Sequence, residues 1–417
     1  MTRNILFIQP TITHRAGIDM VLYPVIKSLS QIKSDNSQDS VLQYKVYTLS
    51  AYENYNKENK SNIIDFDNGA INITMNENID KVSNSSLFSK IFKMFSRAYF
   101  IYKIIKENNI DFVIASSDGL AISSIMAGIF VRHRVKFYAY MHENIKNINS
   151  INRLILKYLF RYFDKIICVS DGLCQSIKEL ALNIKDNKVI TIYNTFENSS
   201  RAEMNTFNLR QTNNAHIYSN AKEIVFLSVG RLEKVKGYEC LIRAFGNFID
   251  SNKNNNNISS PYILHIIGEG NQRKDLESLI FKLKLNDKVK LLGSMNHEDI
   301  YKSLEKSYVF INNSKYETFG VSLVEAMSVG VPVIINDCEY GPKEICKVKI
   351  DQNIDVYNCV FDYGVMCKEG DEKSLTEAMV LMATDKIMYK SFDIQKEINR
   401  SKDFSILNII NKWLEIL

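Results

Sequence analysis

The sequence contains no apolar run long enough to cross a bilayer. Its longest apolar stretch, residues 120–131, is interrupted by serines and is shorter than the roughly 20 residues that a spanning helix needs. A leader pattern is missing as well, because Met1, Thr2 and Arg3 run directly into an apolar, strand-like segment. We therefore expect a cytoplasmic protein whose membrane contact, if it has any, is peripheral at the inner face of the plasma membrane.

Paired cysteines and metal-ligand clusters are absent too. The seven cysteines are an odd number without a Cys-x-x-Cys pair, which is typical of reduced thiols in a cytosolic protein. No histidines and cysteines have the spacing of a metal site. Asp65-Phe66-Asp67 has the Asp-x-Asp form of some metal-dependent transferases, and it remains an alternative although it lies far from the other motifs. We expect neither a metal ion nor another cofactor.

The dinucleotide-binding pattern Gly-x-Gly-x-x-Gly is incomplete. Gly268-Glu269-Gly270 follows the strand-like residues 262–267, but position 273 is Arg instead of the third glycine, which argues against a nicotinamide-dependent oxidoreductase. A strongly basic balance is also lacking, since the net charge is only +5, and no recognised nucleic-acid-binding module occurs. We expect no nucleic-acid partner.

The length of 417 residues fits two domains better than one. Strand-like and helix-like patterns alternate on both sides of a polar stretch, residues 196–220, which is rich in Asn, Ser and Thr. Such alternation is typical of α/β folds with parallel sheets. The sequence thus predicts a first domain over residues 1–197 and a second over residues 221–400.

What the sequence does contain is an ordered series of short polar motifs. They are Gly230-Arg231-Leu232 with Lys236-Gly237, Gly268-Glu269-Gly270, Glu317-Thr318-Phe319-Gly320 with Glu325, and Gly341-Pro342-Lys343-Glu344-Ile345. Each motif alone is weak evidence. In this order along the chain they indicate a site for a nucleotide-diphosphate sugar.

Arg231 and Lys236 are the candidate cations of this site. They lie between the strand-like residues 223–229 and the helical pattern of residues 238–248. That places them at the carboxyl end of a predicted parallel strand, where open α/β sheets bind ligands. A diphosphate leaving group gains negative charge as the sugar bond breaks, so fixed cations stabilise its departure. The alternative is that both are solvated surface charges, as most loop Arg and Lys are.

Glu317 and Glu325 are the candidate carboxylates. Their Glu-x7-Glu spacing does not identify a site by itself, because it recurs at Glu269/Glu277 and Glu369/Glu377. The context is more informative: residues 308–312 read as a buried strand and residues 321–328 as a helix. Amides at that helix start can face phosphate oxygens, and carboxylates offer several acceptors for the hydroxyls of a sugar or ribose.

Together these segments resemble the retaining glycosyltransferases of glycosyltransferase family 4. The resemblance is dense over residues 224–345, with the runs GRLEKVKGYECLIRAF and IIGEG followed by the stretch from Leu291 to Ile345. It implies the GT-B fold, an α/β architecture of two Rossmann-like domains with parallel sheets that face each other across a cleft. It also implies that the final helix, residues 404–417, packs back on the first domain.

The resemblance further implies a role for each motif residue. Arg231 and Lys236 would bind the diphosphate. Glu317 would contact the donor sugar, and Glu325 would contact the ribose. The phosphates would face the backbone amides around Phe319, Gly320 and Val321. The other donor-binding positions are Gly230, Gly268, Glu269 and Gly270.

Two residues of the first half match the same family. His142 follows the strand-like residues 137–141 and corresponds to the family's cleft histidine near the sugar, so it is a candidate catalytic residue. Gly17 corresponds to one of two adjacent glycines near the diphosphate or acceptor. The other glycine is replaced by Ala16 in this chain.

The expected reaction is a metal-independent, retaining transfer of a hexose or N-acetylhexosamine. We expect a nucleotide-diphosphate sugar as donor, UDP-linked, and a glycan acceptor on a lipid carrier. The reason is that residues 341–345 resemble a segment of bacterial enzymes that build surface polysaccharide on lipid carriers, often from UDP-sugars. The alternative is a sugar-nucleotide epimerase on the same fold.

Residues 81–106 form a segment with six basic residues, no acidic one and several aromatic side chains. The first 200 residues carry 24 Lys and Arg against 18 Asp and Glu, so the positive excess lies in this half. The segment from Lys81 to Lys106 is therefore a candidate amphipathic helix for an anionic membrane surface, with Lys90, Lys93 and Arg97 facing the lipid. The alternative is an ordinary helix whose apolar side packs in the core.

Overall fold

The computed structural model forms two compact units. Unit 1 consists of Met1–Phe196 and Ile406–Leu417, and unit 2 consists of Glu197–Ser405. The structure describes residues 2–10, 17–32, 43–50, 70–74, 87–131, 134–196, 223–252, 261–348, 358–384 and 392–417. Ala16, the Asp65–Asp67 motif, residues 81–86 and most of the predicted boundary, residues 197–220, lie outside these ranges.

Unit 1 is built on a seven-stranded parallel sheet with the order β3-β2-β1-β4-β5-β6-β7. The strands are β1 (Thr2–Gln9), β2 (Gln43–Ser50), β3 (Ile71–Thr74), β4 (Phe112–Ala115), β5 (Lys136–Met141), β6 (Lys165–Cys168) and β7 (Val189–Thr191). Their central residues are apolar and buried in unbroken runs, such as residues 5–8 of β1. Such runs are typical of parallel strands that helices cover on both faces.

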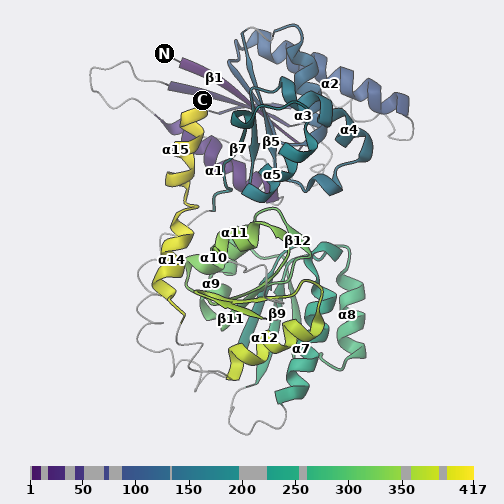
Figure 1. Ribbon diagram of the computed structural model, residues 1–417, viewed down its shortest axis with the longest axis vertical. Helices are drawn as coiled ribbons and strands as arrows, with labels where there is room; N and C mark the ends of the chain where they lie inside the picture. Colours follow the sequence, from purple (N-terminus) through teal and green to yellow (C-terminus); the bar gives the residue numbers. More distant parts are fainter. Residues whose placement is uncertain are drawn as a thin grey trace. The chain divides into compact units, whose positions relative to one another are not determined.

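The described part of unit 1 also contains six α-helices and three 3₁₀ turns (Figure 1). They are α1 (Gly17–Gln31), α2 (Leu87–Glu107), α3 (Asp118–Gly128), α4 (Ser150–Leu159), α5 (Asp171–Leu180) and α15 (Ile406–Ile416), with the turns η2 (Ile145–Asn147), η3 (Phe160–Tyr162) and η4 (Asp186–Lys188). Helix α3 packs between α2 and α4, whereas α1 packs against α15.

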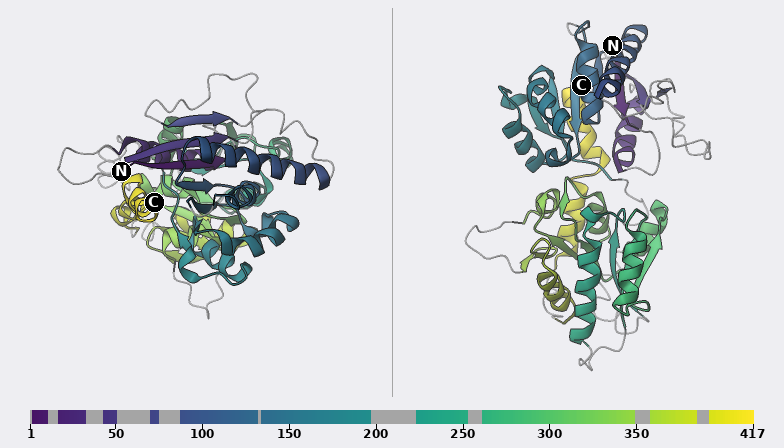
Figure 2. Two further views of the ribbon diagram at one scale, coloured as in Figure 1. Left: turned by 90° about the horizontal axis from the view of Figure 1, so that it is seen from above. Right: turned by 90° about the vertical axis from the view of Figure 1, so that its right-hand side faces the viewer.

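The last helix of the chain is part of the core of unit 1. Trp413 of α15 is only 1% exposed, and its ring contacts those of Phe7 and Tyr140 at 6.0 and 5.7 Å. The hydroxyl of Tyr138 donates a hydrogen bond to the carbonyl of Ile416 at 2.5 Å. The large apolar area of a tryptophan explains why this terminal segment is held in place. Figure 2 shows α15 beside the sheet in two further views.

Unit 2 contains a second seven-stranded sheet with the order β10-β9-β8-β11-β13-β16-β15. The strands are β8 (Ile224–Val229), β9 (Tyr262–Ile267), β10 (Val289–Gly293), β11 (Val309–Asn312), β13 (Val333–Asn336), β15 (Cys359–Phe361) and β16 (Gly364–Cys367). All of these pairs are parallel except β15 with β16. Two short strands, β12 (Tyr316–Glu317) and β14 (Glu339–Tyr340), pair with each other in parallel.

The described part of unit 2 has seven α-helices, and the first of them packs on an aromatic core. They are α7 (Tyr238–Asn252), α8 (Arg273–Lys282), α9 (His297–Lys306), α10 (Val321–Ser328), α11 (Gly341–Cys346), α12 (Glu372–Thr384) and α14 (Ile394–Lys402), with the turn η5 (Lys234–Lys236) before α7. The ring of Phe226 on β8 contacts four other aromatic rings, those of Phe245, Phe248, Tyr262 and Tyr308. Burial of these rings fixes α7 against the sheet.

The strand order reverses once in each sheet. In unit 2 the reversal lies between β8 and β11, because the chain runs outward from β8 to β9 and β10 before it returns to β11. In unit 1 it lies between β1 and β4. At such switch points the loops after neighbouring strands diverge and leave room for a ligand at the carboxyl ends. The predicted α/β class, two Rossmann-like domains with parallel sheets, is confirmed.

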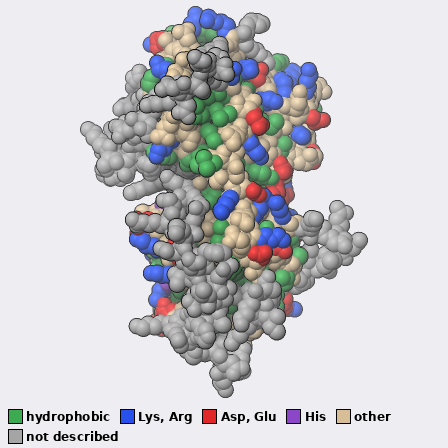
Figure 3. Space-filling view, turned by 90° about the vertical axis from the view of Figure 1, so that its left-hand side faces the viewer, with side chains coloured by type: hydrophobic (Ala, Val, Ile, Leu, Met, Phe, Trp, Pro, Cys, Tyr) green, Lys and Arg blue, Asp and Glu red, His purple; other side chains and the backbone are tan. Residues whose placement is uncertain are grey.

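Within the described part of the chain, no helix has the length and hydropathy that crossing a membrane requires. The same residues contain no cluster of three or more His, Cys, Asp or Glu side chains placed to hold a metal ion. On the face drawn in Figure 3, described basic side chains are interspersed with acidic ones. No single sign of charge dominates this face, so its surface charge does not indicate a ligand. Individual charged groups at the strand ends are the better guide to a binding site.

Candidate functional site

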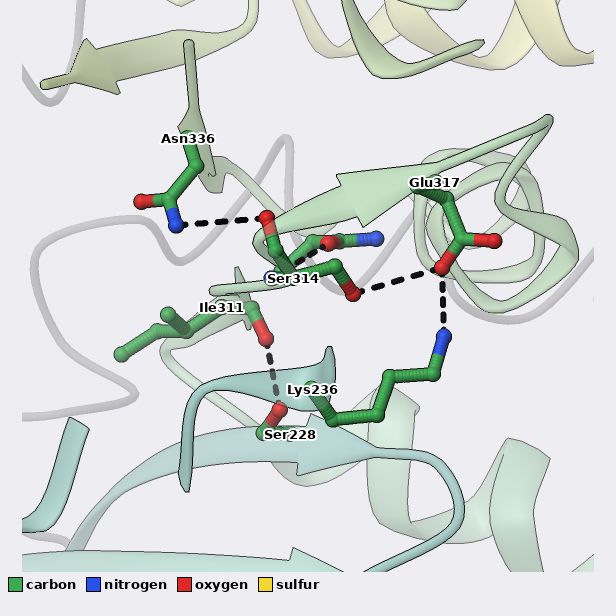
Figure 4. A network of polar contacts seen from close by, with 7 residues as sticks. Ser228, Lys236, Ile311, Ser314, Glu317 and Asn336 are labelled. Atoms are coloured by element: carbon green, nitrogen blue, oxygen red, sulfur yellow. Dashed lines mark hydrogen bonds and ion pairs between the residues drawn. The ribbon is translucent and has the colours of Figure 1, made fainter. Parts of the chain in front are cut away.

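Lys236 and Glu317 form an ion pair at the switch point of unit 2 (Figure 4). Nζ of Lys236 lies 2.5 Å from Oε2 of Glu317. Lys236 belongs to the loop after β8 and Glu317 to β12, which follows β11. The side chains are 22% and 16% exposed, so solvent and salt screen this pair less than one on the open surface. The structure therefore brings together two residues that the sequence predicts for one site.

Main-chain contacts hold the two loops of this pair against each other. The side-chain amide of Asn313 donates to the carbonyl of Gly237 at 2.8 Å, and the amide of Lys315 donates to the carbonyl of Val235 at 2.8 Å. A Cβ at Gly237 would lie 2.3 Å from the carbonyl oxygen of Asn313, and its φ is +67°. Only glycine fits this approach without strain, so the loop that carries Lys236 is fixed before any ligand arrives.

A polar network behind the ion pair was not predicted from the sequence. Oγ of Ser314 donates to Oε2 of Glu317 at 3.3 Å, and the Asn336 side chain donates to the carbonyl of Ser314 at 3.3 Å. The Ser228 hydroxyl donates to the carbonyl of Ile311 at 2.7 Å, which ties β8 to β11. Polar residues directly after a buried strand, as in Asn312-Asn313-Ser314, are the sequence signal that could have identified this network.

Tyr238 adds a protonated hydroxyl beneath this network. It is 2% exposed at the start of α7. Burial raises the pKa of its phenol, and the neighbouring Glu317 carboxylate acts in the same direction, although a hydrogen bond with Ser228 opposes them. The phenol is therefore neutral at physiological pH. Because the Ser228 hydroxyl gives its proton to the Ile311 carbonyl, the Tyr238 hydroxyl is the donor in its hydrogen bond with Ser228.

Arg231 does not join the ion pair in this structure. Its side chain is 71% exposed, and its guanidinium pairs with Glu233 in the same loop at 2.7 Å. Exposed pairs of this kind contribute about 1 kcal/mol or less. The guanidinium is therefore held only weakly and lies within the loop that also carries Lys236.

The predicted glycines of this site pack backbone against backbone. A Cβ at Gly268, whose φ is +144°, would lie 2.0 Å from the carbonyl oxygen of Gly230, and one at Gly270 would lie 2.4 Å from that of Leu232. No side chain fits in such a space. This close approach of the loops after β8 and β9 is sufficient to explain why both positions are glycine, and the explanation does not require a bound ligand. Glu269 points to Arg273 at 2.6 Å, and its side chain is 48% exposed.

Helix α10 places amides and a carboxylate next to the Glu317 loop. Gly320 precedes the helix with φ +111°, and Val321 is its first residue. The first amides of a helix have no intrahelical acceptor and attract anions. Phe319 contributes backbone only, because its side chain is 1% exposed and its ring packs on Phe404 at 5.3 Å. Glu325 lies one turn into the helix, and its side chain is 10% exposed.

His142 lies in unit 1, directly after Met141, the last residue of β5. Its side chain is 11% exposed, and Nε2 lies 3.9 Å from a carboxylate oxygen of Glu143. Burial lowers the imidazole pKa to about 4, although a hydrogen bond with the Tyr140 backbone and the Asp118 carboxylate act in the opposite direction. The ring is therefore neutral at physiological pH. Gly17 is the first residue of α1.

In unit 2 the arrangement combines a cation, the amides at the start of a helix and two carboxylates near the carboxyl ends of β8 and β11. Cation and amides suit phosphate oxygens, and the carboxylates suit hydroxyl groups. The site therefore has the chemistry to bind a ligand with both a phosphate and a polyol part.

Models of two protein families match the chain. The one described as glycosyl transferases group 1 matches residues 210–397. The one described as glycosyltransferase family 4 matches residues 75–197. The first match contains the predicted site residues of unit 2, and the second contains His142.

Individual proteins agree with these matches. An uncharacterized glycosyltransferase of Methanocaldococcus jannaschii is 30% identical over 356 residues, which are 77% of this chain and 82% of that protein. The UDP-Gal:α-D-GlcNAc-diphosphoundecaprenol α-1,3-galactosyltransferase of Escherichia coli is 25% identical over 75% of this chain and 79% of its own. The crystal structure of Anabaena HepE with UDP and glucose has a TM-score of 0.68 at 16% identity, and covers 99% of both chains.

Proposed function

This chain belongs to the glycosyltransferases of family 4, which have the GT-B fold, and we propose that it transfers a hexose or N-acetylhexosamine from a UDP-linked donor to a glycan on a lipid carrier. We further propose that the transfer retains the anomeric configuration, needs no metal ion, and serves the synthesis of a bacterial surface polysaccharide. The Lys236–Glu317 pair at the switch point of unit 2 carries the proposal.

In the proposed reaction, the bond between the anomeric carbon and the diphosphate breaks and a bond to the acceptor oxygen forms. The acceptor hydroxyl attacks the face of the sugar that the diphosphate leaves, and its proton passes to the leaving diphosphate oxygen, so the products are the glycosylated acceptor and the nucleoside diphosphate. Lys236 and Arg231 bind the departing diphosphate together with the amides at the start of α10. Stabilisation of charge that develops on a leaving group is often the largest single contribution to catalysis. Glu317 accepts hydrogen bonds from the sugar and Glu325 from the ribose.

Two relatives support the choice of donor and acceptor. The Escherichia coli protein is named for a UDP-sugar donor and an acceptor on diphosphoundecaprenol, and the Anabaena structure was determined with UDP and glucose. His142 and Gly17 lie in unit 1 and keep the roles that the family resemblance implies as predictions. No observation favours the epimerase alternative, which incubation with the donor alone would reveal by its epimerised sugar product.

Binding of UDP is expected to raise the melting temperature. At a hundredfold excess over Kd, a ligand that binds only the folded state adds about 2.7 kcal/mol, which corresponds to roughly 3 °C for a protein of this size. The shift should persist in excess EDTA and should be smaller for Glu325→Ala. A thermal-shift screen of UDP, GDP and other nucleotide diphosphates measures it. If none of these nucleotides raises the melting temperature, the proposed donor site is contradicted.

We also propose that unit 1 binds the membrane that holds the acceptor. Most of the exposed large apolar side chains in the described part of the chain lie on or next to α2, α3 and α4, which pack side by side. They are Ile91, Phe92, Phe95, Tyr99, Ile129, Phe130, Ile151, Leu154, Tyr158 and Tyr162. Exposed aromatic and aliphatic groups on adjacent helices suit insertion into a lipid headgroup region.

The predicted role of one basic residue on α2 is wrong. Lys93 is only 8% exposed and does not face the surface. It shares a side of the helix with the buried residues Ile101 and Ile104, because these positions follow it after two and three helical turns. Its methylene chain therefore packs toward the core, as long basic side chains often do. The exposed side of α2 carries Phe92, Phe95 and Tyr99 instead, so apolar insertion is the main proposed contribution.

The triple variant Phe92→Ser, Phe95→Ser, Tyr99→Ser is expected to lose binding to anionic liposomes. Each ring transferred from water to an apolar environment contributes about 1.5 kcal/mol or more, so the loss of three rings should lower the partition coefficient about a thousandfold or more. Co-sedimentation measures this, and the UDP-induced thermal shift should be unchanged. Phe281→Ser is the matched control, because Phe281 is 74% exposed but lies in unit 2. If the wild-type protein does not bind anionic liposomes at low salt, the proposed membrane contact of unit 1 is refuted.

A further inference from the structure

His297 is fixed beside Glu325 by the start of helix α9. Asn296 caps this helix, with its side-chain oxygen accepting from the amide of Asp299 at 2.9 Å. His297 is therefore the first helical residue, and its ring packs edge-to-face on Tyr301 one turn later, with centroids 4.9 Å apart. In this position Nε2 of His297 lies 3.0 Å from Oε1 of Glu325.

The contact has a defined direction. An ionised carboxylate only accepts hydrogen bonds, so the Nε2–H group of His297 donates to Oε1 of Glu325. Glu325 is 10% exposed, whereas His297 is 26% exposed and lies on the more open side of the pair. A hydrogen bond to a buried charge is short and strong. It fixes the carboxylate in one orientation and uses one of its two oxygens.

The proposed ribose contact needs a carboxylate that is already oriented. A free carboxylate on a helix samples several rotamers, and a ligand must then restrict them at an entropic cost. The imidazole restricts them in advance through Oε1, and Oε2 retains its lone pairs for a ligand hydroxyl. Sequence motifs did not indicate His297, because it lies outside the Glu-x7-Glu spacing and on a different helix.

We propose that His297 is a positioning residue for donor recognition: it orients Glu325 toward the ribose hydroxyls and so makes the site select ribonucleoside over deoxyribonucleoside diphosphates. This inference rests on the proposed ribose contact of Glu325. A site built to bind a hydroxyl rejects an analogue that lacks it, because the buried acceptor is then left unpaired. The selectivity depends on the orientation of the acceptor, which the imidazole sets.

The test compares His297→Ala with wild type by calorimetric binding of UDP and of its 2′-deoxy and 3′-deoxy analogues. Loss of a hydrogen bond to a charged group should weaken UDP binding by roughly tenfold or more. Wild type should bind one of the two deoxy analogues more weakly than the other. For that analogue, the ratio of its Kd to the Kd of UDP should fall by a similar factor in His297→Ala. In steady-state kinetics the donor KM should rise, and kcat should stay within about threefold, as for a residue that acts on binding. His297→Gln, which keeps an N–H donor, should restore part of the preference.

The control is Glu298→Ala, on the same turn of α9, where the carboxylate is 68% exposed and pairs with Lys302. It should leave both UDP affinity and ribose preference unchanged. If His297→Ala keeps the wild-type preference while Glu325→Ala has lost it, the inference is overturned and the ribose contact stands. If Glu325→Ala also binds all three nucleotides as wild type does, the ribose contact itself fails, and the inference fails with it.

Discussion

Lys236→Ala is expected to lower the turnover of sugar transfer about a hundredfold or more. Removing one preorganised charge partner of a leaving group typically has an effect of this size, which corresponds to about 2.7 kcal/mol of transition-state stabilisation. Lys236 meets the structural requirement for such a role. Its ammonium is held by Glu317 at 2.5 Å, and hydrogen bonds from Asn313 and Lys315 fix the backbone of its loop.

The matched control is Lys234→Ala. Lys234 lies two residues earlier on the same 3₁₀ turn, and its side chain is exposed, so its removal should change turnover by less than about twofold. Arg231→Ala should act in the same direction as Lys236→Ala, because the Arg231 guanidinium belongs to the same loop and is proposed to bind the same diphosphate. Its ion pair with Glu233 is an exposed contact, which restrains it weakly. Initial-rate measurements with the nucleotide sugar selected by the thermal-shift screen compare all three. Near-normal transfer by Lys236→Ala would remove Lys236 from the diphosphate site.

The elements around the site follow from local sequence patterns. The predicted helix over residues 321–328 and the predicted strand over residues 262–267 have the bounds found in the structure. Both are apolar segments with clear ends, and burial on both faces makes parallel strands nearly continuous apolar runs. The pair of Lys236 and Glu317 could be predicted for a related reason. Each follows a buried strand, and the carboxyl ends of parallel strands share one edge of a sheet.

What sequence patterns miss depends on contacts between distant elements. The side chain of Asn336 reaches the carbonyl of Ser314, and His297 reaches Glu325 from another helix. Neither pairing has a fixed sequence spacing. Lys93 was misplaced because charge alone does not tell whether a long side chain lies along the core side of a helix. Glu269 shares the Glu-x7-Glu spacing, but its geometry serves a surface ion pair with Arg273.

Glu317→Ala is expected to lower kcat/KM for the sugar donor about a hundredfold and to leave the affinity for UDP nearly unchanged. In the proposed role, this carboxylate accepts hydrogen bonds from the hydroxyls of the transferred sugar. UDP does not carry that sugar, so its affinity does not depend on these bonds. Hydrogen bonds to a charged group contribute about 1.5–3 kcal/mol, so losing them accounts for a hundredfold effect. Lys236→Ala should differ, because it removes a contact to the diphosphate and should weaken UDP binding as well.

The Glu369→Ala, Glu377→Ala double variant is the matched control. These carboxylates have the same spacing, but both side chains are exposed at the surface. Their loss should change kcat/KM by less than about threefold. Urea unfolding of each variant checks the fold, since Lys236 loses its partner when Glu317 is removed and an uncompensated, partly buried charge destabilises a protein. Equal loss of transfer in both variants, or normal transfer by Glu317→Ala, would show that Glu317 does not contact the sugar.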